Sequence, residues 1–358
     1  MTPFSPIHFD SADGAWATLA KGLLFDGVTA SPNGFGTREI LGANLSIPMT
    51  RPVITPAVRK LSYRGMAAEA LWICTGSDSL DELSPWLPAY EKFSDDGEIL
   101  FGAYGPRFRD QLDHVVSQLL RDPWSRRAVM TLWRPNPPTK TKDTPCTLTL
   151  TFQIRRETSD KLAKYVLHTH VHMRSSDAFL GIPYDWFSFS CMSALVAARI
   201  NAGLGFTVDH VHGGARTTAP RYSDGVLNTL YRTGEGMELG WDVEGRGSGI
   251  ARVPIGLGRL YWSAASSHLY ERDVTRTIET MQAIDMRETR EVEDMPTGLY
   301  VGGTKSEEFL LGGLLAVRGE LASGDDFSGE TIPMMAHVGG KPVSRAVGRT
   351  WDFIPKDR

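Results

Sequence analysis

Three cysteines, Cys74, Cys146 and Cys191, are the first candidates for nucleophilic chemistry in this sequence. Cys146 follows Pro145 at the start of an apolar alternating run, an edge position where a thiol can be partly exposed. The other two cysteines lie in apolar helical runs. Because a cysteine reacts as a thiolate that its target must reach, Cys146 is the candidate nucleophile. Free cysteine is among the most buried residue types, so a core position for all three is the alternative.

A polar segment, RSSDAFLGIPYD at 174–185, directly follows a predicted strand. It gathers Arg174, two serine hydroxyls, Asp177 and Asp185 around a Gly-Ile-Pro turn. Such a group of side chains can hold an anion and a heterocycle. A polar loop with a capping aspartate would have the same composition.

Arg126 and Arg127 are adjacent at the start of another predicted strand. Alternation along a regular strand sends neighbouring side chains to opposite faces, so a shared phosphate would require a loop or a bulge there. Solvated surface arginines are the alternative.

Histidines recur at two-residue spacing in two places: His168, His170 and His172, and later His210 and His212. Imidazoles on one strand face can bind a metal. Because no cysteine or carboxylate cluster accompanies them, we expect packed or surface histidines and no metal.

Length and composition exclude several classes of protein. At ~150 residues per domain, 358 residues predict about two domains or one large one. A content of 41% hydrophobic and 22% charged residues is that of a globular protein, not a disordered one. The net charge of -4 gives no general reason to bind nucleic acid or an anionic membrane. Three cysteines are too few for a disulfide scaffold, and neither a leader nor an apolar run of ~20 residues is present, so we expect a soluble cytoplasmic protein.

Hydrophobic periodicity predicts helices interleaved with strands. Helices are expected over 11–26, over 109–121, 187–204 and 268–284, and in the second part of 51–76, where the helix ends near Gly76. Strands are expected within 31–47, 126–134, 147–156, 164–174 and 256–264. The spacing is not that of regular βαβ units, which favours an α+β fold.

Seven motifs follow one another along the chain: a glycine turn at 31–42, MAAEALWICTGSDSL (66–80), FGAYGPRFR (101–109), DPWSRRAVMTLW (122–133), PC (145–146), RSSDAFLGIPYD (174–185) and GRLYWSAASSHLY (258–270). In this order they resemble the thymidylate synthase family. The resemblance implies one catalytic domain over 1–358, a mixed β-sheet flanked by helices, and a homodimer joined sheet to sheet. An insertion at about 205–255 and a divergent C-terminal part from about 285 would account for the extra length.

The resemblance also implies roles for individual residues. Cys146 would add to C6 of a pyrimidine nucleotide, Glu69 would organise water and proton transfers, and Tyr104 would assist proton movement at C5. Residues implied to bind the nucleotide are Arg174, Ser175, Ser176, Asp185, His268 and Tyr270, with Arg126 and Arg127 reaching the phosphate in the neighbouring subunit. The co-substrate 5,10-methylenetetrahydrofolate would lie against Glu69, Tyr90, Phe93, Asp177, Leu180, Gly181 and Tyr184. Adjacent arginines, together with the surroundings of the bound nucleotide, can lower the pKa of the thiol.

Asp185 bears on the choice of base. Thymidylate synthases have an asparagine at this position, whose amide matches the N3–H donor and O4 acceptor of uracil. A carboxylate instead accepts from the amino group of cytosine and from N3 once it is protonated. A mismatched buried edge costs about 1–3 kcal/mol, so Asp185 favours cytosine and narrows the resemblance to the cytidylate 5-hydroxymethylases. An aspartate capping a helix that begins near Trp186 is the alternative.

Other departures from the synthase pattern point the same way. Thr147 stands where the synthases carry a histidine, and Tyr90 and Phe93 stand where they carry two tryptophans. A changed aromatic wall could admit the water that a hydroxymethylase adds to the exocyclic methylene. Pro32 replaces a phosphate-binding arginine, for which Arg38 or an arginine of 205–255 could substitute.

The sequence therefore predicts hydroxymethylation at C5 of CMP or dCMP with 5,10-methylenetetrahydrofolate and water, without a metal. We expect no membrane or nucleic-acid partner. One alternative is a uridylate methylase or hydroxymethylase in which Asp185 is a helix cap. Another is a non-catalytic nucleotide- or RNA-binding homologue, although the joint presence of Cys146, Glu69 and Tyr104 argues against it.

Overall fold

The computed structural model describes residues 6–135, 137–159, 162–203, 207–211, 214–218 and 255–286, together with Leu314. Within the expected insertion at about 205–255, the described residues form only the antiparallel pair β8 (Thr207–Val211) and β9 (Gly214–Thr218). The rest of that insertion, with His212, and the expected divergent C-terminal part beyond 286 lie outside the described residues, apart from Leu314.

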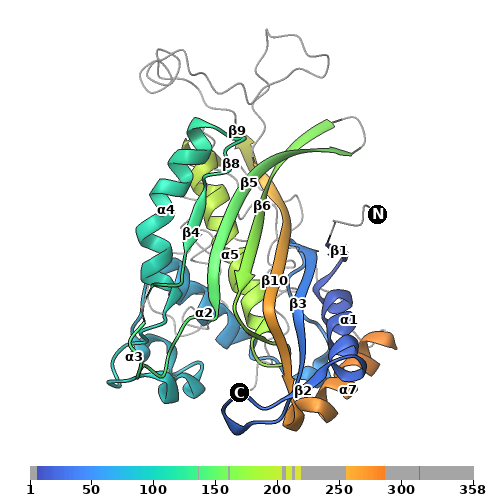
Figure 1. The fold of residues 1–358 in the computed structure, drawn as a ribbon. Coiled ribbons are helices and arrows are strands. Elements are labelled where there is room, and N and C mark those ends of the chain that lie inside the picture. Colours follow the sequence, from blue (N-terminus) through green and yellow to red (C-terminus); the bar gives the residue numbers. More distant parts are fainter. Residues whose placement is uncertain are drawn as a thin grey trace.

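An eight-stranded mixed sheet forms the centre of the described structure (Figure 1). Its main path runs β1 (Ile7–His8), β3 (Thr37–Pro48), β10 (Gly256–Tyr270), β6 (Leu162–Met173), β5 (Thr147–Ser159) and β4 (Val129–Thr131). Two short strands are added: β2 (Val28–Ala30) pairs with β3, and β7 (Ser176–Asp177) pairs with β10. Since β10 is antiparallel to β3 but parallel to β6, the sheet is mixed and the predicted α+β class is confirmed.

Helices pack behind the sheet as it is seen in Figure 1. They are α1 (Ala12–Phe25), α2 (Tyr63–Thr75), α3 (Leu80–Leu83), α4 (Tyr104–Arg121), α5 (Ile182–Gly203) and α7 (Val274–Asp285). The layer between helices and sheet is filled by large apolar side chains, among them Trp16, Trp186 and Trp262, which have no exposed surface. Burial of this apolar area is the main force that holds the layers together.

Local signals define two helix ends. The Oγ of Ser11 accepts a hydrogen bond from the Gly14 N–H and so caps α1. Gly76 ends α2 with φ 89°, a left-handed conformation that glycine adopts without strain.

Three predicted boundaries are wrong. The helix α4 begins at Tyr104 instead of 109 and α5 begins at Ile182 instead of 187, because Pro106 and Pro183 lie in first turns, where a missing N–H costs nothing. The strand β10 continues to Tyr270, so the helix expected from 268 begins only at Val274. Pairing of Tyr270 with Thr37 extends that strand, and this contact has no local signal.

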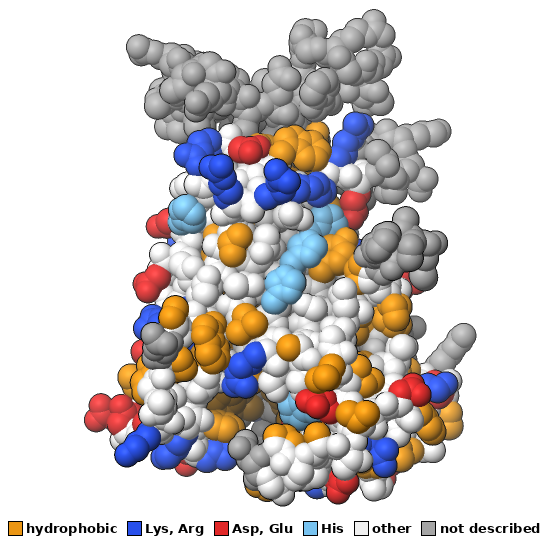
Figure 2. Space-filling model, in the orientation of Figure 1, with side chains coloured by type: hydrophobic (Ala, Val, Ile, Leu, Met, Phe, Trp, Pro, Cys, Tyr) orange, Lys and Arg blue, Asp and Glu red, His pale blue; other side chains and the backbone are white. Residues whose placement is uncertain are grey.

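The face of the sheet turned toward the viewer in Figure 2 shows a short row of histidines near its middle. On this face His170 stacks on Tyr261 at 4.4 Å between ring centroids, and His172 Nδ1 lies 2.8 Å from the Ser263 hydroxyl. Among the described residues no group of three or more His, Cys, Asp or Glu side chains could hold a metal ion. No helix in the described ranges is both long and apolar enough to cross a membrane.

Candidate active site

Cys146 lies half-buried immediately before β5, whereas Cys74 and Cys191 are fully buried in the core, as the sequence predicts. Arg174 holds the segment that carries this nucleophile. Its Nε donates to the Pro145 carbonyl at 2.8 Å, and its Nη2 donates to the Thr144 carbonyl at 2.8 Å and to Cys146 Sγ at 3.7 Å. The guanidinium therefore lies directly against the thiol.

The thiol of Cys146 is not activated in the free protein. Burial raises its pKa above the usual value, and the carboxyls of Asp185, Asp143 and Asp177 raise it further. Arg174 lowers the pKa, in the predicted direction, but does not outweigh burial. The pKa of this thiol in the protein alone therefore lies above, not below, its usual value.

Tyr104 opens α4 and points its hydroxyl at the residue after the nucleophile. The oxygen accepts hydrogen bonds from Thr147 Oγ1 at 2.9 Å and from the Thr147 backbone N–H at 3.3 Å. Its ring stacks on Phe189 of α5, with ring centroids 6.5 Å apart. The nearby Asp185 and Cys146 help to raise the pKa of Tyr104 well above its usual value, after burial.

Glu69 extends from the middle of α2 beneath the aromatic segment Pro88–Phe93. The hydroxyl of Tyr90 donates to Oε1 of Glu69, whereas Oε2 is buried and has no hydrogen-bond partner among the described residues. Burial raises the pKa of Glu69 to about 7, and the bond from Tyr90 opposes that rise. A carboxyl with a pKa near 7 can both accept and donate a proton at neutral pH.

Asp185 lies in the first turn of α5, three residues after the helix begins. Its backbone N–H donates to the Gly181 carbonyl, but its carboxyl makes no hydrogen bond or ion pair within the described part of the chain. The carboxyl therefore does not cap the helix, contrary to the alternative drawn from the sequence. Burial, and then the charges of Glu69 and Asp177, raise its pKa well above the usual value.

Gly181 gives this carboxyl its space. A side-chain carbon added at Gly181 would lie 3.3 Å from Asp185 Oδ2 and 3.2 Å from the Asp177 carbonyl oxygen. Those contacts are tighter than ordinary van der Waals packing, so the position favours glycine.

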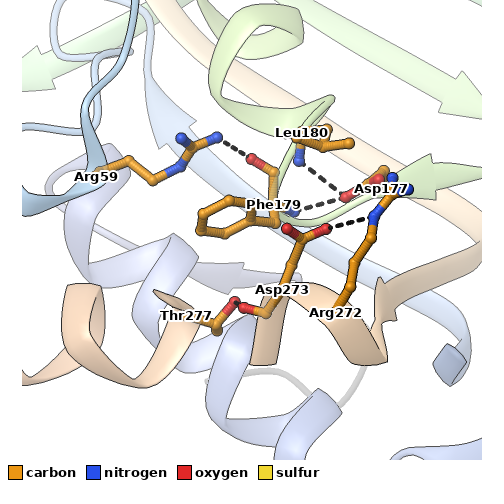
Figure 3. A network of polar contacts seen from close by, with 7 residues as sticks. All are labelled: Arg59, Asp177, Phe179, Leu180, Arg272, Asp273 and Thr277. Atoms are coloured by element: carbon orange, nitrogen blue, oxygen red, sulfur yellow. Dashed lines mark hydrogen bonds and ion pairs between the residues drawn. The ribbon is translucent and has the colours of Figure 1, made fainter. Parts of the chain in front are cut away.

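A network of polar contacts holds the turn that leads into α5 (Figure 3). Asp177 Oδ1 accepts from the backbone N–H groups of Phe179 and Leu180, both at 2.8 Å. Arg59, only 5% exposed, lies 3.8 Å above the Phe179 ring and donates to the Phe179 carbonyl. The sequence reasoning did not single out Arg59, because nothing local distinguishes it from a surface arginine.

Comparison with known proteins decides the family. The thymidylate synthase family model matches residues 16–214, more than half of the chain and all of the elements that carry Glu69, Tyr104, Cys146 and Asp185. The chain belongs to the thymidylate synthase family. It is 25% identical over 205 residues to a thymidylate synthase of Buchnera aphidicola subsp. Baizongia pistaciae (strain Bp), a match that covers 53% of this chain and 74% of that relative.

Membership confirms the resemblance and gives the general chemistry. The thymidylate synthase family transfers a one-carbon unit from methylenetetrahydrofolate to C5 of a pyrimidine nucleotide. Cys146, Glu69, Tyr104 and Asp185, which the sequence ties to that chemistry, come from four different elements or their edges. Their charges influence one another's pKa values: Glu69 acts on Asp185, and Asp185 acts on Tyr104 and Cys146, so the four residues lie near one another.

The side expected to bind folate in this family has an aromatic edge. Tyr90 and Phe93 meet edge to face at 6.1 Å, and Phe93 is 39% exposed. Leu180 is 44% exposed, and the Tyr184 hydroxyl accepts from the Ser62 N–H at 3.2 Å. Tyr184 thus joins the start of α5 to the start of α2.

The residues expected to bind the nucleotide divide into two groups. His268 and Tyr270 lie at the end of β10 with their rings edge to face at 5.3 Å, and Cys146 is close enough to help raise the pKa of Tyr270. Ser175 is half-buried next to Arg174, but the Ser176 hydroxyl is fully buried without a partner among the described residues. Neighbouring residues of a strand face opposite ways, so Ser176 does not share the face of Asp177.

Three arginines named from the sequence lie away from this group. Arg126 and Arg127 are exposed in the segment before β4, so the predicted strand begins after them and the strand-face difficulty does not arise. The guanidinium of Arg38 donates to the Leu24 carbonyl at 3.1 Å, and Arg38 lies opposite Leu269 where β3 pairs with β10. Because neighbouring strand residues face opposite ways, Arg38 lies on the face of the sheet opposite to that of Tyr270.

Proposed function

We propose that this protein hydroxymethylates C5 of a cytosine nucleotide, CMP or dCMP, using 5,10-methylenetetrahydrofolate and water. The observation that carries the proposal is the carboxyl of Asp185, half-buried near Glu69 and Asp177 without a hydrogen-bond partner among the described residues. A carboxyl withdrawn from water without a partner is costly, so a ligand that satisfies it binds with an advantage.

Cytosine supplies what this carboxyl lacks. With its proton on, Asp185 donates to N3 and accepts from the amino group; after that proton passes to N3, the carboxylate accepts from both positions. The raised pKa of Asp185 supports a proton at this place before cytosine binds. Uracil already carries a hydrogen on N3 and has no lone pair there to take the proton of Asp185, and an Asp185 that has lost this proton would face the lone pairs of O4.

The remaining residues supply the covalent steps. Cys146 Sγ forms a bond to C6 as N3 takes the proton, which makes C5 nucleophilic. C5 then bonds to the one-carbon unit of the folate, and Tyr104 receives the C5 hydrogen as a proton. The bond between that carbon and the folate nitrogen breaks, which releases tetrahydrofolate and leaves an exocyclic methylene on C5. Glu69 takes a proton from water as the water oxygen bonds to the exocyclic methylene, the methylene electrons move into the ring, and Sγ leaves C6 as a thiolate.

The side chains present suit the folate. The exposed Phe93 and Leu180 offer apolar surface to a flat heterocycle; Phe93 contacts Tyr90, and the Leu180 N–H donates to Asp177. When bound, the folate supplies a one-carbon unit at the oxidation level of formaldehyde.

We also propose a homodimer in which Arg126 and Arg127 reach the phosphate bound by the partner subunit. Both arginines are exposed and lie close in sequence to Trp124, a large apolar side chain that is 54% exposed. The guanidinium carbon of Arg155 lies 5.6 Å from the centroid of the Trp124 ring. In the same subunit as the nucleophile, Arg174 and Ser175 would hold the phosphate. A phosphate needs several charge-assisted bonds, and arginines are suited to give them.

A uridylate methylase is the second candidate, because the relative reported above is named a thymidylate synthase. Asp185 argues against it, since its carboxyl provides no permanent donor for O4. The two candidates differ in their products, so one assay separates them.

The test is incubation of the full chain with CMP, dCMP, UMP or dUMP and methylenetetrahydrofolate, followed by mass analysis. We expect a gain of one CH2O on a cytosine nucleotide, with tetrahydrofolate released. A gain of CH2 on dUMP with dihydrofolate formed would overturn the proposal.

A further inference from the structure

The contact between Glu69 and Tyr90 makes the two oxygens of one carboxyl unequal. Tyr90, on the turn Pro88–Phe93, donates its hydroxyl hydrogen to Oε1. Oε2 is buried and has no hydrogen-bond partner within the described ranges. A buried carboxylate oxygen without a partner is rare in folded proteins, and bound water or substrate commonly satisfies such an atom.

Other phenols near Glu69 have different partners. The Tyr184 oxygen accepts from the Ser62 backbone, and the Tyr104 oxygen accepts from Thr147. Phe93 meets the Tyr90 ring edge to face and so helps to fix its orientation. Tyr90 is thus the phenol that sets which oxygen of Glu69 is available.

The groups that face this pair are acidic or phenolic. Asp185 and Tyr104 act on Tyr90, while Tyr184 feels the charge of Glu69. Among the described residues no lysine or arginine lowers the pKa of Glu69; burial raises it, and the hydrogen bond from Tyr90 opposes that rise. The hydrogen bond from Tyr90 is therefore the chief stabilisation of its charged form within the described residues.

Building on the proposed function, we propose that Tyr90 is a positioning residue: it holds Oε1 of Glu69 so that Oε2 alone binds and deprotonates the water that adds to the nucleotide. The step balances within the reaction already given. Water loses one proton to Oε2 and its oxygen bonds to the exocyclic carbon; the proton returns to solvent after product leaves. Tyr90 itself touches no reacting atom and keeps its proton throughout.

The experiment compares the pH dependence of kcat for the wild type, Tyr90→Phe and a control, Tyr63→Phe. Tyr63 lies on the same helix as Glu69, but its hydroxyl points to the Ile54 carbonyl, 3.4 Å away. A general base works only when deprotonated, so the rate falls as pH drops below its pKa. Without the bond from Tyr90 the pKa of Glu69 rises, and we expect the acidic limb to move up by about one pH unit.

The expected pattern is specific. At neutral pH, kcat of Tyr90→Phe falls about fivefold with nucleotide KM nearly unchanged, and the deficit narrows as pH rises. Tyr63→Phe keeps the wild-type profile. An equal loss at every pH, or a rise in KM alone, would overturn the positioning role.

A second measurement keeps this inference apart from the proposed function. If the wild type converts no pyrimidine nucleotide, the proposed function has failed. The titration of Glu69 is then followed by carbon-13 NMR of glutamate-labelled protein, with Glu69→Gln to assign the signal. A higher midpoint in Tyr90→Phe than in wild type supports the inference, and equal midpoints overturn it.

Discussion

Thr147 donates two hydrogen bonds to the oxygen of Tyr104, one from Oγ1 at 2.9 Å and one from its backbone N–H at 3.3 Å. With both acceptor positions occupied, the phenolic hydrogen points in a third direction and is free to be given away. The same two bonds stabilise the phenolate that forms when Tyr104 loses its proton. The residue after the nucleophile thereby orients the hydroxyl of Tyr104 and partly offsets the rise in its pKa that burial, Asp185 and Cys146 cause.

Substituting Thr147 by valine keeps the shape of the side chain and removes the Oγ1 donor. We expect exchange of the C5 hydrogen of bound nucleotide with solvent deuterium to slow about tenfold, because the phenolate loses one of two stabilising bonds. Mass spectrometry of the recovered nucleotide measures the exchange. Thr147→Ser retains the hydroxyl and serves as the matched control; equal rates in the two variants would show that the hydroxyl has no such role.

Replacing Asp185 by asparagine should shift the preference from cytosine to uracil nucleotides. The amide provides a permanent donor for O4 and no longer accepts from two donors of cytosine. We expect the ratio of kcat/KM for the two bases to change by about 10- to 100-fold, the size of one mismatched buried edge. Steady-state kinetics with CMP, dCMP, UMP and dUMP test this, and an unchanged ratio would refute the role of Asp185.

Alkylation of Cys146 by iodoacetamide should be slow at neutral pH and accelerate as pH rises. Burial holds the pKa of the thiol above its usual value, so the thiolate fraction grows only in alkaline solution. Arg174→Ala removes the charge that lowers this pKa and should move the alkylation curve to still higher pH. Peptide mapping separates Cys146 from the buried Cys74 and Cys191, and a shift to lower pH in Arg174→Ala would contradict the assignment.

Cys146→Ser or Cys146→Ala should abolish turnover, because the hydroxyl or methyl group cannot form the bond to C6 at a useful rate. Product formation by mass analysis measures the loss. Substantial residual activity would rule out the covalent mechanism. Both variants should keep the fold, since the native thiol is only half-buried at a strand edge.

Mixing two inactive variants tests whether Arg126 and Arg127 complete the active site of the partner subunit. Arg126→Ala/Arg127→Ala keeps its own nucleophile, and Cys146→Ala keeps its arginines. In a dimer that exchanges subunits, random pairing would restore about a quarter of the sites. Activity recovered on mixing supports the proposed contact between subunits. Should a monomeric variant bind the nucleotide as tightly as wild type, the arginines would have no such role.

Much of this protein is specified locally. Ser11 and Gly76 mark helix ends because a cap depends on residues a few positions apart, and apolar periodicity is enough to place the helices over 12–25 and 63–75. Motif order alone identifies the family. The residue types at 146, 69 and 185 likewise limit the chemistry, because a thiol is a nucleophile and a carboxyl transfers protons. At position 185 a carboxyl also differs from the asparagine amide of thymidylate synthases in what it can donate and accept.

Tertiary structure decides what these residues can do. The bond from Tyr90 to Glu69 spans 21 positions and the bond from Thr147 to Tyr104 spans 43, so neither has a local signal. Burial determines that the pKa of Cys146 rises instead of falling and that Glu69 titrates near 7. Tertiary structure also places Tyr270 in β10, because only its pairing with Thr37 extends the strand that far. Desolvation and pairing depend on distant segments meeting, whereas residue type and periodicity belong to the chain itself.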